Sequence, residues 1–308
     1  MKLNVSGITK SFGEKLVLDD ISFEASNGTA FGLLGRNGAG KTTSLRIIMG
    51  VFPPDSGEII IDGERRTGSR AKVGYLPEER GLYPKKPILA QMVYLGELRG
   101  MKSSDAKKSA LRWLERLEMS EYANKRLDTL SKGNQQKIQL GATLLTDPDI
   151  VILDEPFSGL DPVNSLMLKD IVLDLVKEGK CVIFSSHQMG HIDDLCREIA
   201  IINGGKIVVG GNLQKIKRSY ARDRVIVKME DEHVPAAKEM YADKFKDIIA
   251  EISSSEYHVD IKLTSPDKKT ELLRGISECG YDIDGFDVYE PSLNDIFIKY
   301  TGGGETEL

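Results

Sequence analysis

The chain has 308 residues, 40% of them hydrophobic and 29% charged, which predicts a soluble globular protein of about two domains. A net charge of −5 argues against a general attraction to nucleic acid or anionic lipid, and three scattered cysteines without CxxC spacing predict free thiols in a reducing compartment. No apolar run approaches the ~20 residues that cross a bilayer, and the first residues have no signal-peptide core, so any work at a membrane is expected to need another polypeptide.

Short β-like runs separated by turns fill the first part of the chain, among them TAFGLLG and GEIIIDGERR. From Lys85 to about Asp147 the pattern becomes helical, beginning with PILAQMVYLGELRG. Two buried-strand runs follow, DIVILDEP and KCVIFSSH, with a helix-like segment between them. Short apolar strands that alternate with helices predict an α/β fold, in which helices cover a mostly parallel sheet.

A second pattern begins after a basic, polar stretch at about 212–224, which we interpret as a helix and linker. The predicted elements then follow the order βαββαβ, from RVIVKM to DIDGFDVY, and this order is typical of a small ferredoxin-like α+β domain. The sequence therefore predicts two domains, at 1–215 and 222–302, the first with a helical subdomain at about 85–147. The closing TGGGETEL is expected to lack regular structure.

A phosphate-binding loop is predicted at GRNGAGKTT, which fits the pattern G-x-x-x-x-G-K-[ST] and lies between a strand-like run and a helix. Its glycines let successive backbone N–H groups turn inward to form a nest for phosphate oxygens. Lys41 is expected to reach the β- and γ-phosphates, and the Thr42 hydroxyl to ligate Mg²⁺. The predicted nucleotide contacts in this loop are Gly35, Arg36, Asn37, Gly38, Ala39, Gly40, Lys41, Thr42 and Thr43.

Two carboxylates, Asp154 and Glu155, directly follow the apolar strand IVIL. Asp154 is expected to hold the hydration shell of Mg²⁺, and Glu155 to accept a proton from the attacking water. A general base contributes roughly 10²–10⁴ in rate, so Glu155 favours hydrolysis over nucleotide binding alone. Two surface acids at a turn are the alternative, which the preceding strand and the upstream phosphate loop disfavour.

His187 ends the next predicted strand, where we expect it to meet the γ-phosphate. His191 lies four residues on, so metal chelation by this pair is an alternative. The absence of an HExxH motif and of a third histidine nearby disfavours it, since only Asp193 and Asp194 remain as partners.

Taken together, these motifs resemble an ATP-binding cassette (ABC) ATPase over about Met1 to Gly211. LSKGNQQK, which precedes the strand that ends at Asp154, is similar to the LSGGQ signature of that family. The resemblance implies a P-loop NTPase fold, an ABC nucleotide-binding domain with a helical subdomain. It further implies that Ser131 and the backbone at Gly133 bind the γ-phosphate of ATP held by a second, facing ATPase subunit, most simply another copy of this chain.

Other residues of this sequence match further motif positions of the family. Phe12 in KSFG matches the aromatic residue that stacks on adenine, Asp161 in SGLD matches the D-loop, and His187 matches the switch histidine. The sequence departs from the family pattern at the Q-loop glutamine and at the first glycine and the glutamine of the signature, which are here Glu78, Lys132 and Asn134. The acidic side chain at the Q-loop position adds charge near Mg²⁺ and is a candidate metal ligand.

The stretches LSKGNQQK, YLPEERGLY and PSLNDIF narrow the resemblance to ATPase subunits of ABC-2-type exporters, notably the sodium and drug efflux branch. It implies ATP and Mg²⁺ as cofactors, membrane permease partners, no nucleic acid, a cytoplasmic location at the inner face of the cell membrane, and an accessory C-terminal domain. A packing or dimerisation role is favoured for that domain over a regulatory sensor.

The alternative function is a soluble, non-transport ABC ATPase of translation or DNA maintenance. The chain has one phosphate loop, too few residues between Lys41 and Asp154 for a long coiled coil, and an acidic pI, all of which disfavour this alternative. A nucleotide-binding regulator without turnover is disfavoured because Glu155 and His187 are both present.

Overall fold

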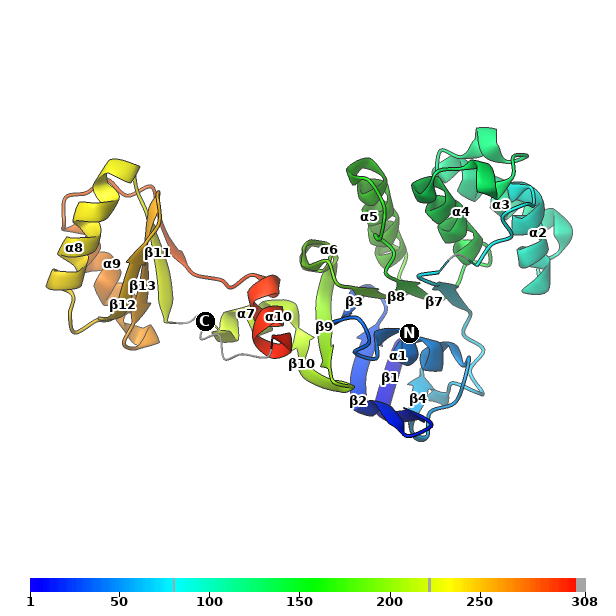
Figure 1. Cartoon of the computed structure of the whole chain (residues 1–308), viewed down its shortest axis with the longest axis horizontal. Helices are drawn as coiled ribbons and strands as arrows, with labels where there is room; N and C mark the ends of the chain where they lie inside the picture. The colour runs from blue at the N-terminus through cyan, green and yellow to red at the C-terminus, as the bar shows by residue number, and fades with distance from the viewer. Residues whose placement is uncertain (80, 221–222, 303–308) are drawn as a thin grey trace. The chain divides into compact units, whose positions relative to one another are not determined.

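The computed structural model describes residues 1–79, 81–220 and 223–302, and its contacts divide the chain into two compact units (Figure 1). The first unit holds Met1–Leu213 and the described residues from Phe297 onward, and the second holds Gln214–Ile296. The expectation that the closing stretch lacks regular structure falls, from residue 303, outside the described residues. Within the described ranges, no helix is long and apolar enough to cross a membrane.

A six-stranded sheet with the strand order β10-β9-β3-β8-β7-β6 forms the centre of the first unit. Five of its strands are parallel and β10 is antiparallel, because it returns from β9 through a hairpin. The central strands are buried throughout, as expected for a parallel sheet covered on both faces. The strands are β3 (Ala30–Gly35), β6 (Val73–Leu76), β7 (Ile150–Asp154), β8 (Cys181–Ser186), β9 (Cys196–Asn203) and β10 (Lys206–Asn212).

A second, antiparallel sheet has the strand order β2-β1-β4-β5. Its strands are β1 (Lys2–Phe12), β2 (Lys15–Ser26), β4 (Ser56–Ile61) and β5 (Glu64–Arg65). Apolar side chains of both sheets and of α1 (Lys41–Met49) form one buried core, which includes Leu3, Ile8, Leu33, Ile48, Ile152 and Ile183. Each such aliphatic side chain contributes about 1.5–3 kcal/mol on burial, so this core fixes the strand ends that carry the candidate site.

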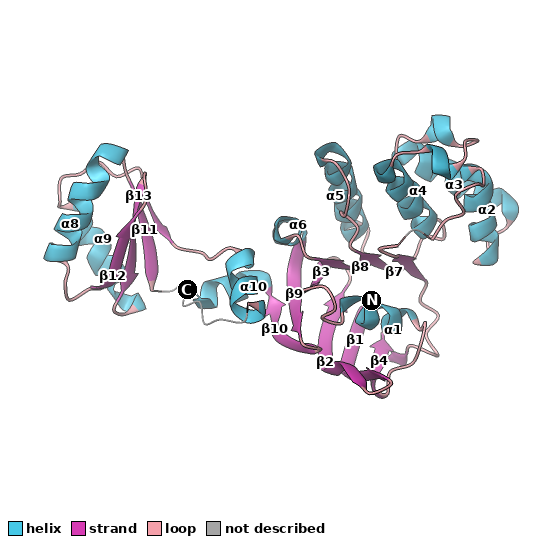
Figure 2. Cartoon of the chain, in the orientation of Figure 1, coloured by secondary structure: helices cyan, strands magenta, loops and turns pink. Residues whose placement is uncertain are grey.

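Three helices, α2 (Ile88–Leu98), α3 (Ser103–Arg116) and α4 (Lys132–Leu144), pack on one another beside the β7 side of the large sheet (Figure 2). Gly141 lets them approach closely, because a Cβ atom there would lie 2.9 Å from Leu117 Cδ1. The helical subdomain expected at about 85–147 corresponds to this group. The remaining helices of the first unit include α5 (Pro162–Lys177) and α6 (Met189–Leu195). Helix α7 (Leu213–Tyr220) begins with Leu213, which belongs to the first unit, and its other residues belong to the second.

The second unit has the predicted order βαββαβ. Its antiparallel sheet has the strand order β12-β13-β11-β14, which is the ferredoxin-like arrangement, so the expected α+β fold is confirmed. The elements are β11 (Arg224–Lys228), α8 (Val234–Lys244), β12 (Ile249–Ser254), β13 (His258–Leu263), α9 (Lys269–Ser277) and β14 (Gly285–Val288). Alternate residues of β11 and β13 are buried, and they pack in a core with Tyr241 and Leu272.

Candidate active site

The phosphate loop connects the end of β3 at Gly35 to the start of α1 at Lys41. Gly40 has φ +115° and no room for a side chain, since a Cβ atom would lie 2.5 Å from Leu18 Cδ2. No side chain caps α1, and its first turn has no acidic residue. Its first N–H groups and its positive dipole end are therefore available to an anion, as the sequence predicts.

The Lys41 side chain is buried beside the loop. Its Nζ donates a hydrogen bond to the carbonyl oxygen of Gly35 at 2.7 Å and lies 3.5 Å from Glu155 Oε1. The predicted phosphate-binding cation and the predicted base are thus brought together, although they are far apart in the sequence. A buried ammonium group with these two partners is held where a phosphate oxygen can replace the carboxylate.

The end of β7 places Asp154 in the interior, with no exposed surface. Its two carboxylate oxygens each accept a hydroxyl hydrogen bond, Oδ1 from Ser185 at 2.6 Å and Oδ2 from Tyr75 at 3.2 Å. Burial, and then the charge of Asp154, raise the pKa of Tyr75 to about 12, so its phenol remains a donor at neutral pH. No cation lies within ion-pair distance of this buried carboxylate among the described residues, which suits a site for a metal ion.

Glu155 follows Asp154 with a left-handed backbone, φ +49°, and a buried side chain. Its Oε2 lies 2.8 Å from His187 Nδ1 and also faces the backbone N–H of His187 at 3.4 Å. Its Oε1 is buried without a hydrogen-bond partner in the described part of the chain. Since a buried carboxylate oxygen is costly to leave unpaired, Oε1 is suited to accept a hydrogen bond from a bound water.

The two histidines that follow β8, His187 and His191, have different contacts. His187 is half exposed and contacts Glu155, whereas His191 stacks on Phe157 with ring centroids 3.9 Å apart. Burial lowers the pKa of His191, as expected for a packed imidazole. The alternative of a metal held by this pair therefore gains no support.

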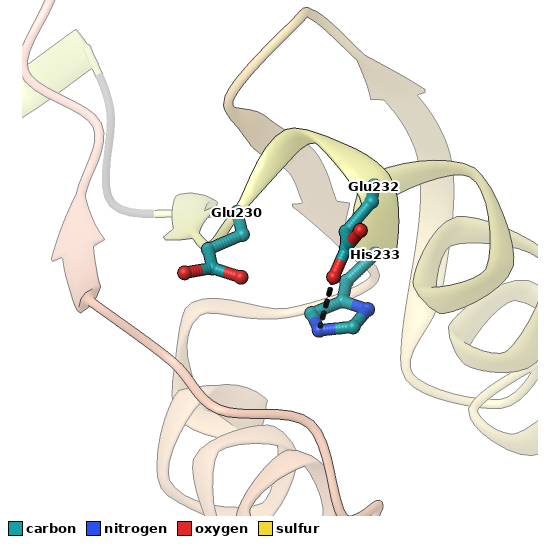
Figure 3. Close-up of side chains that lie close together, drawn as sticks. All are labelled: Glu230, Glu232 and His233. Atoms are coloured by element: carbon teal, nitrogen blue, oxygen red, sulfur yellow. Dashed lines mark ion pairs between the residues drawn. The ribbon is translucent and has the colours of Figure 1, made fainter.

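One group of potential metal ligands is found within the described residues, and it lies in the second unit: Glu230, Glu232 and His233. The candidate ligand atoms lie within 4.8 Å of one another, and Glu232 forms an ion pair with His233 (Figure 3). Both glutamates are exposed, and exposed carboxylates next to a histidine are stable without an ion. We assign no metal to this group.

The signature stretch lies at the start of α4, where exposed Ser131 caps the helix by accepting the N–H of Asn134 at 3.3 Å. The first turn again has no acidic residue. Asp161 caps α5 in the same way through the N–H of Asn164 at 2.9 Å, and this hydrogen bond lowers the pKa of Asp161. No described hydrogen bond or ion pair joins Ser131 or Asp161 to the phosphate loop of the same chain. The structure does not bring these predicted residues to the site.

The remaining predicted residues lie on exposed surface. Phe12 is 49% exposed and meets Phe52 edge-on, with ring centroids 5.4 Å apart, and Lys10 Nζ lies 5.8 Å from the Phe12 ring centroid. Glu78 is exposed on the loop after β6. The amide of buried Gln139, on α4, holds that loop by donating to the carbonyl oxygens of Pro77 and Glu79.

Three residues of the site went unnoticed in the sequence: Tyr75, Gln139 and Ser185. Each is a polar side chain at a position that the strand or helix pattern marks as buried. That conflict is the signal that identifies them, because buried polar groups require specific partners.

The end of helix α10 (Leu293–Thr301) also lies beside the phosphate loop. Arg36 Nη1 donates to the carbonyl oxygen of Thr301 at 3.3 Å, and Asn203 Nδ2 donates to that of Tyr300 at 2.8 Å. These are two of the last carbonyl groups of the helix, which have no partner within it. A cavity of about 720 Å³ borders this contact, lined by Arg36, Asn37, Gly38, Ala39, His187, Asn203, Gly204 and Phe297.

A phosphate loop at the end of one parallel strand, two carboxylates at the end of a second and a histidine after a third together define a P-loop nucleoside-triphosphate hydrolase. Comparisons with known proteins identify its family. The ABC transporter family model matches residues 18–158, and the model of the DrrA1-3-like ATP-binding protein C-terminal domain matches residues 211–301.

Two of the relatives compared match almost the whole chain and a third matches about two thirds of it. An uncharacterised ABC transporter ATP-binding protein of Bacillus subtilis, YhaQ, is 40% identical over 97% of this chain and 98% of its own length. The linearmycin resistance ATP-binding protein LnrL of Bacillus subtilis is 30% identical over 97% of this chain and 98% of its own. The Nod factor export ATP-binding protein I of Paraburkholderia xenovorans is 35% identical over 66% of this chain and 68% of its own.

Among solved structures, an ATP-binding subunit of an ABC transporter aligns with a TM-score of 0.66 and 26% identity, over 71% of this chain and 93% of that one. The chain belongs to the ABC transporter ATP-binding proteins. The predicted fold class is confirmed, and so is the predicted activity, an ATPase whose ATP hydrolysis powers transport.

Proposed function

We propose that this chain is the ATP-hydrolysing subunit of an ABC-type exporter. Two copies would form a nucleotide sandwich and act with separate permease subunits at the cytoplasmic face of the cell membrane. The export role is supported by similarity to relatives named for linearmycin resistance and Nod factor export. In this proposal residues 1–215 are the ATPase domain, and residues 222–302 are an accessory domain similar to the DrrA-like C-terminal domain.

The observation that carries hydrolysis is the buried Oε1 of Glu155, which faces the Lys41 ammonium group but accepts no hydrogen bond from the described residues. His187 engages Oε2, which leaves Oε1 to take the proton of the attacking water. The Lys41 ammonium, now 3.5 Å from Oε1, would turn to the phosphates when a nucleotide enters the loop and so release the base.

Mg²⁺ fits the same site. Thr42 and Asp154 would hold it, with the exposed Glu78 as a candidate for its water shell. When bound, the ion neutralises charge on the β- and γ-phosphates. The chain's part is to orient the buried Asp154 carboxyl group, and the two hydroxyl donors on its oxygens do this.

A sandwich dimer would complete the site, because Ser131, Gly133 and Asp161 have no described bond to their own phosphate loop. A helix N-terminus contributes only ~0.3–2 kcal/mol to anion binding. Closure therefore needs both signature helices and both nucleotides together. The capped but acid-free start of α4 supports a role in binding the partner's γ-phosphate.

The surface around the loop after β6 is our candidate for permease contact. Buried Gln91 orders this loop, accepting the N–H of Tyr83 and donating to the carbonyl oxygens of Tyr83 and Lys86. A cavity of about 330 Å³ lies here, lined by Tyr83, Lys86, Ala90, Gln91 and Tyr94. The two tyrosines are about half exposed, which suits a contact that forms and reopens during a transport cycle.

The test is Glu155→Gln, which keeps the shape of the side chain and removes the base. We expect the variant to bind MgATP, to lose at least ~100-fold in turnover, and to accumulate as a dimer on size-exclusion chromatography in ATP. The wild-type chain, which hydrolyses its ATP, is the control and should remain mostly monomeric. A variant that hydrolyses ATP normally, or stays monomeric with ATP bound, contradicts the proposal.

A further inference from the structure

Ser185 lies at the junction of the two catalytic carboxylates. It lies on β8 opposite Asp154, the last residue of β7, and this is the last pair of their parallel register. Its side chain has no exposed surface. The single hydroxyl makes two hydrogen bonds: it donates to Asp154 Oδ1 at 2.6 Å and accepts the backbone N–H of Glu155 at 3.0 Å.

The hydrogen bond from the Glu155 N–H to Ser185 holds a left-handed backbone conformation at Glu155. Glu155 is one of five described residues other than glycine with positive φ, the others being Asp20, Asp62, Glu118 and Asp147. For a side chain with a Cβ atom this conformation is strained and persists only where the surroundings enforce it. The β7–β8 ladder ends at Asp154, so the Glu155 N–H has left the sheet and depends on Ser185. Without that acceptor it would be a buried donor with no partner.

The orientation of Glu155 follows from this turn. Its left-handed backbone brings the side chain between Lys41 and His187, with Oε2 beside the histidine and Oε1 facing the ammonium group without a hydrogen bond from the described residues. A relaxed backbone would carry the carboxylate away from both. The same hydroxyl fixes one oxygen of Asp154, while Tyr75 fixes the other.

We propose that Ser185 is a positioning residue that uses one hydroxyl to align both the metal-side carboxylate and the general base. The inference rests on the proposed roles of Asp154 and Glu155. It gives the two hydroxyl groups different roles. Of the two acidic residues, Tyr75 bonds only to Asp154, whereas Ser185 bonds to both Asp154 and Glu155. Loss of Tyr75 should therefore disturb the metal requirement, and loss of Ser185 should disturb the metal requirement and turnover together.

The experiment compares Ser185→Ala with Tyr75→Phe in steady-state ATPase assays at varied Mg²⁺. For Ser185→Ala we expect kcat to fall ~10–100-fold and the Mg²⁺ concentration at half-maximal rate to rise several-fold, while KM for ATP at saturating Mg²⁺ stays nearly constant. For Tyr75→Phe we expect the rise in Mg²⁺ requirement with a much smaller loss of kcat.

A second readout does not need turnover. In the Glu155→Gln background, the thermal shift caused by ATP is measured with Mg²⁺ and with EDTA. Adding Ser185→Ala should remove most of the Mg²⁺-dependent part of the shift and leave the EDTA part, which reports on the phosphate loop. If Ser185 had only a structural role, its loss would lower the melting temperature and would not affect the Mg²⁺-dependent shift more than the shift in EDTA.

Ser186→Ala is the matched control, because it deletes a buried hydroxyl from the same strand for which no hydrogen bond to either carboxylate is described. Ser186 Oγ accepts the N–H of Gln188 at 2.9 Å. This variant should keep the Mg²⁺ requirement of the wild type. If Ser185→Ala is unstable, Ser185→Cys replaces the hydroxyl with a larger thiol, which is a weak donor and acceptor, and should show the same pattern.

Unchanged kcat and Mg²⁺ requirement in a folded Ser185 variant would overturn the proposal. A loss of activity shared equally with Ser186→Ala, at constant Mg²⁺ requirement, would also overturn it, because it would indicate a structural role only. The failure of the proposed function looks different: in that case Glu155→Gln itself would hydrolyse ATP normally.

Discussion

Lys41 links the phosphate loop to the candidate general base. In the structure its ammonium group is shared between the Gly35 carbonyl oxygen and Glu155 Oε1, so it neutralises a buried carboxylate. Breaking such a pair by removing the cation leaves an uncompensated buried charge. The side chain thus has a structural role before ATP arrives and a binding role afterwards.

Replacing Lys41 tests its role in binding ATP. Lys41→Ala is expected to weaken ATP binding at least ~100-fold, about 3 kcal/mol, because the charge-assisted contact with the phosphates is lost. Isothermal titration calorimetry with MgATP measures the change. Lys169→Ala, which removes an ammonium group paired with Asp194 on α6, is the control and should bind normally. Retained tight affinity in Lys41→Ala would show that the loop does not bind phosphate as proposed.

The start of α4 shows how one element can serve both stability and assembly. Ser131 contributes a helix cap, worth about 1 kcal/mol, and occupies the position that the proposed sandwich presents to a partner's nucleotide. Because aspartate caps a helix as well as serine does, the two contributions can be separated by a single substitution.

Ser131→Asp is expected to keep the melting temperature and the ATP affinity of the monomer, since α4 remains capped and the phosphate loop is intact. It places a negative charge where the γ-phosphate of the facing subunit would lie. In the Glu155→Gln background it should therefore abolish ATP-dependent dimerisation, measured by sedimentation velocity. Ser131→Asn, capped but neutral, is the control and should dimerise better than the aspartate variant. Equal dimerisation of the two would argue against a trans contact.

The elements predictable from the sequence were those with a local pattern. The phosphate loop, the strand that ends in Asp154 and the order βαββαβ each follow from a few neighbouring residues. Ser185, Tyr75 and Gln139 could not be placed in advance, because their roles arise from strand register and from a helix that crosses a loop. Pairing across a sheet joins residues far apart in the chain, and no spacing rule encodes it.

At the scale of the whole chain, the sequence did not predict that α10 is divided between the two units. The pattern of the last hundred residues predicts one accessory domain, but contacts assign the end of α10, from Phe297, to the first unit. Two side chains of the first unit, Arg36 and Asn203, donate hydrogen bonds to the last carbonyl groups of this helix. Such capping from outside the helix leaves no periodic signal.

Arg36→Ala tests that contact. We expect the end of α10 to loosen, with a stability loss of about 1 kcal/mol and faster amide hydrogen exchange in residues 293–302. ATP affinity should change little, because the loop binds phosphate mainly through backbone N–H groups and Lys41. Arg116→Ala, which removes an exposed ion pair with Asp174, is the control. Unchanged exchange at α10 in Arg36→Ala would show that the contact does not hold the helix.

The contact between α10 and the phosphate loop also matters for anyone who wishes to isolate the ATPase by truncation. A fragment cut at the sequence-defined border near residue 215 would lose Phe297, Tyr300 and Thr301 and would bare the surface around Arg36 and Asn203. Kinetic constants from such a fragment would describe an enzyme with an altered neighbour to its nucleotide loop. We expect that joining residues 293–302 to the fragment by a flexible linker would restore the missing neighbour.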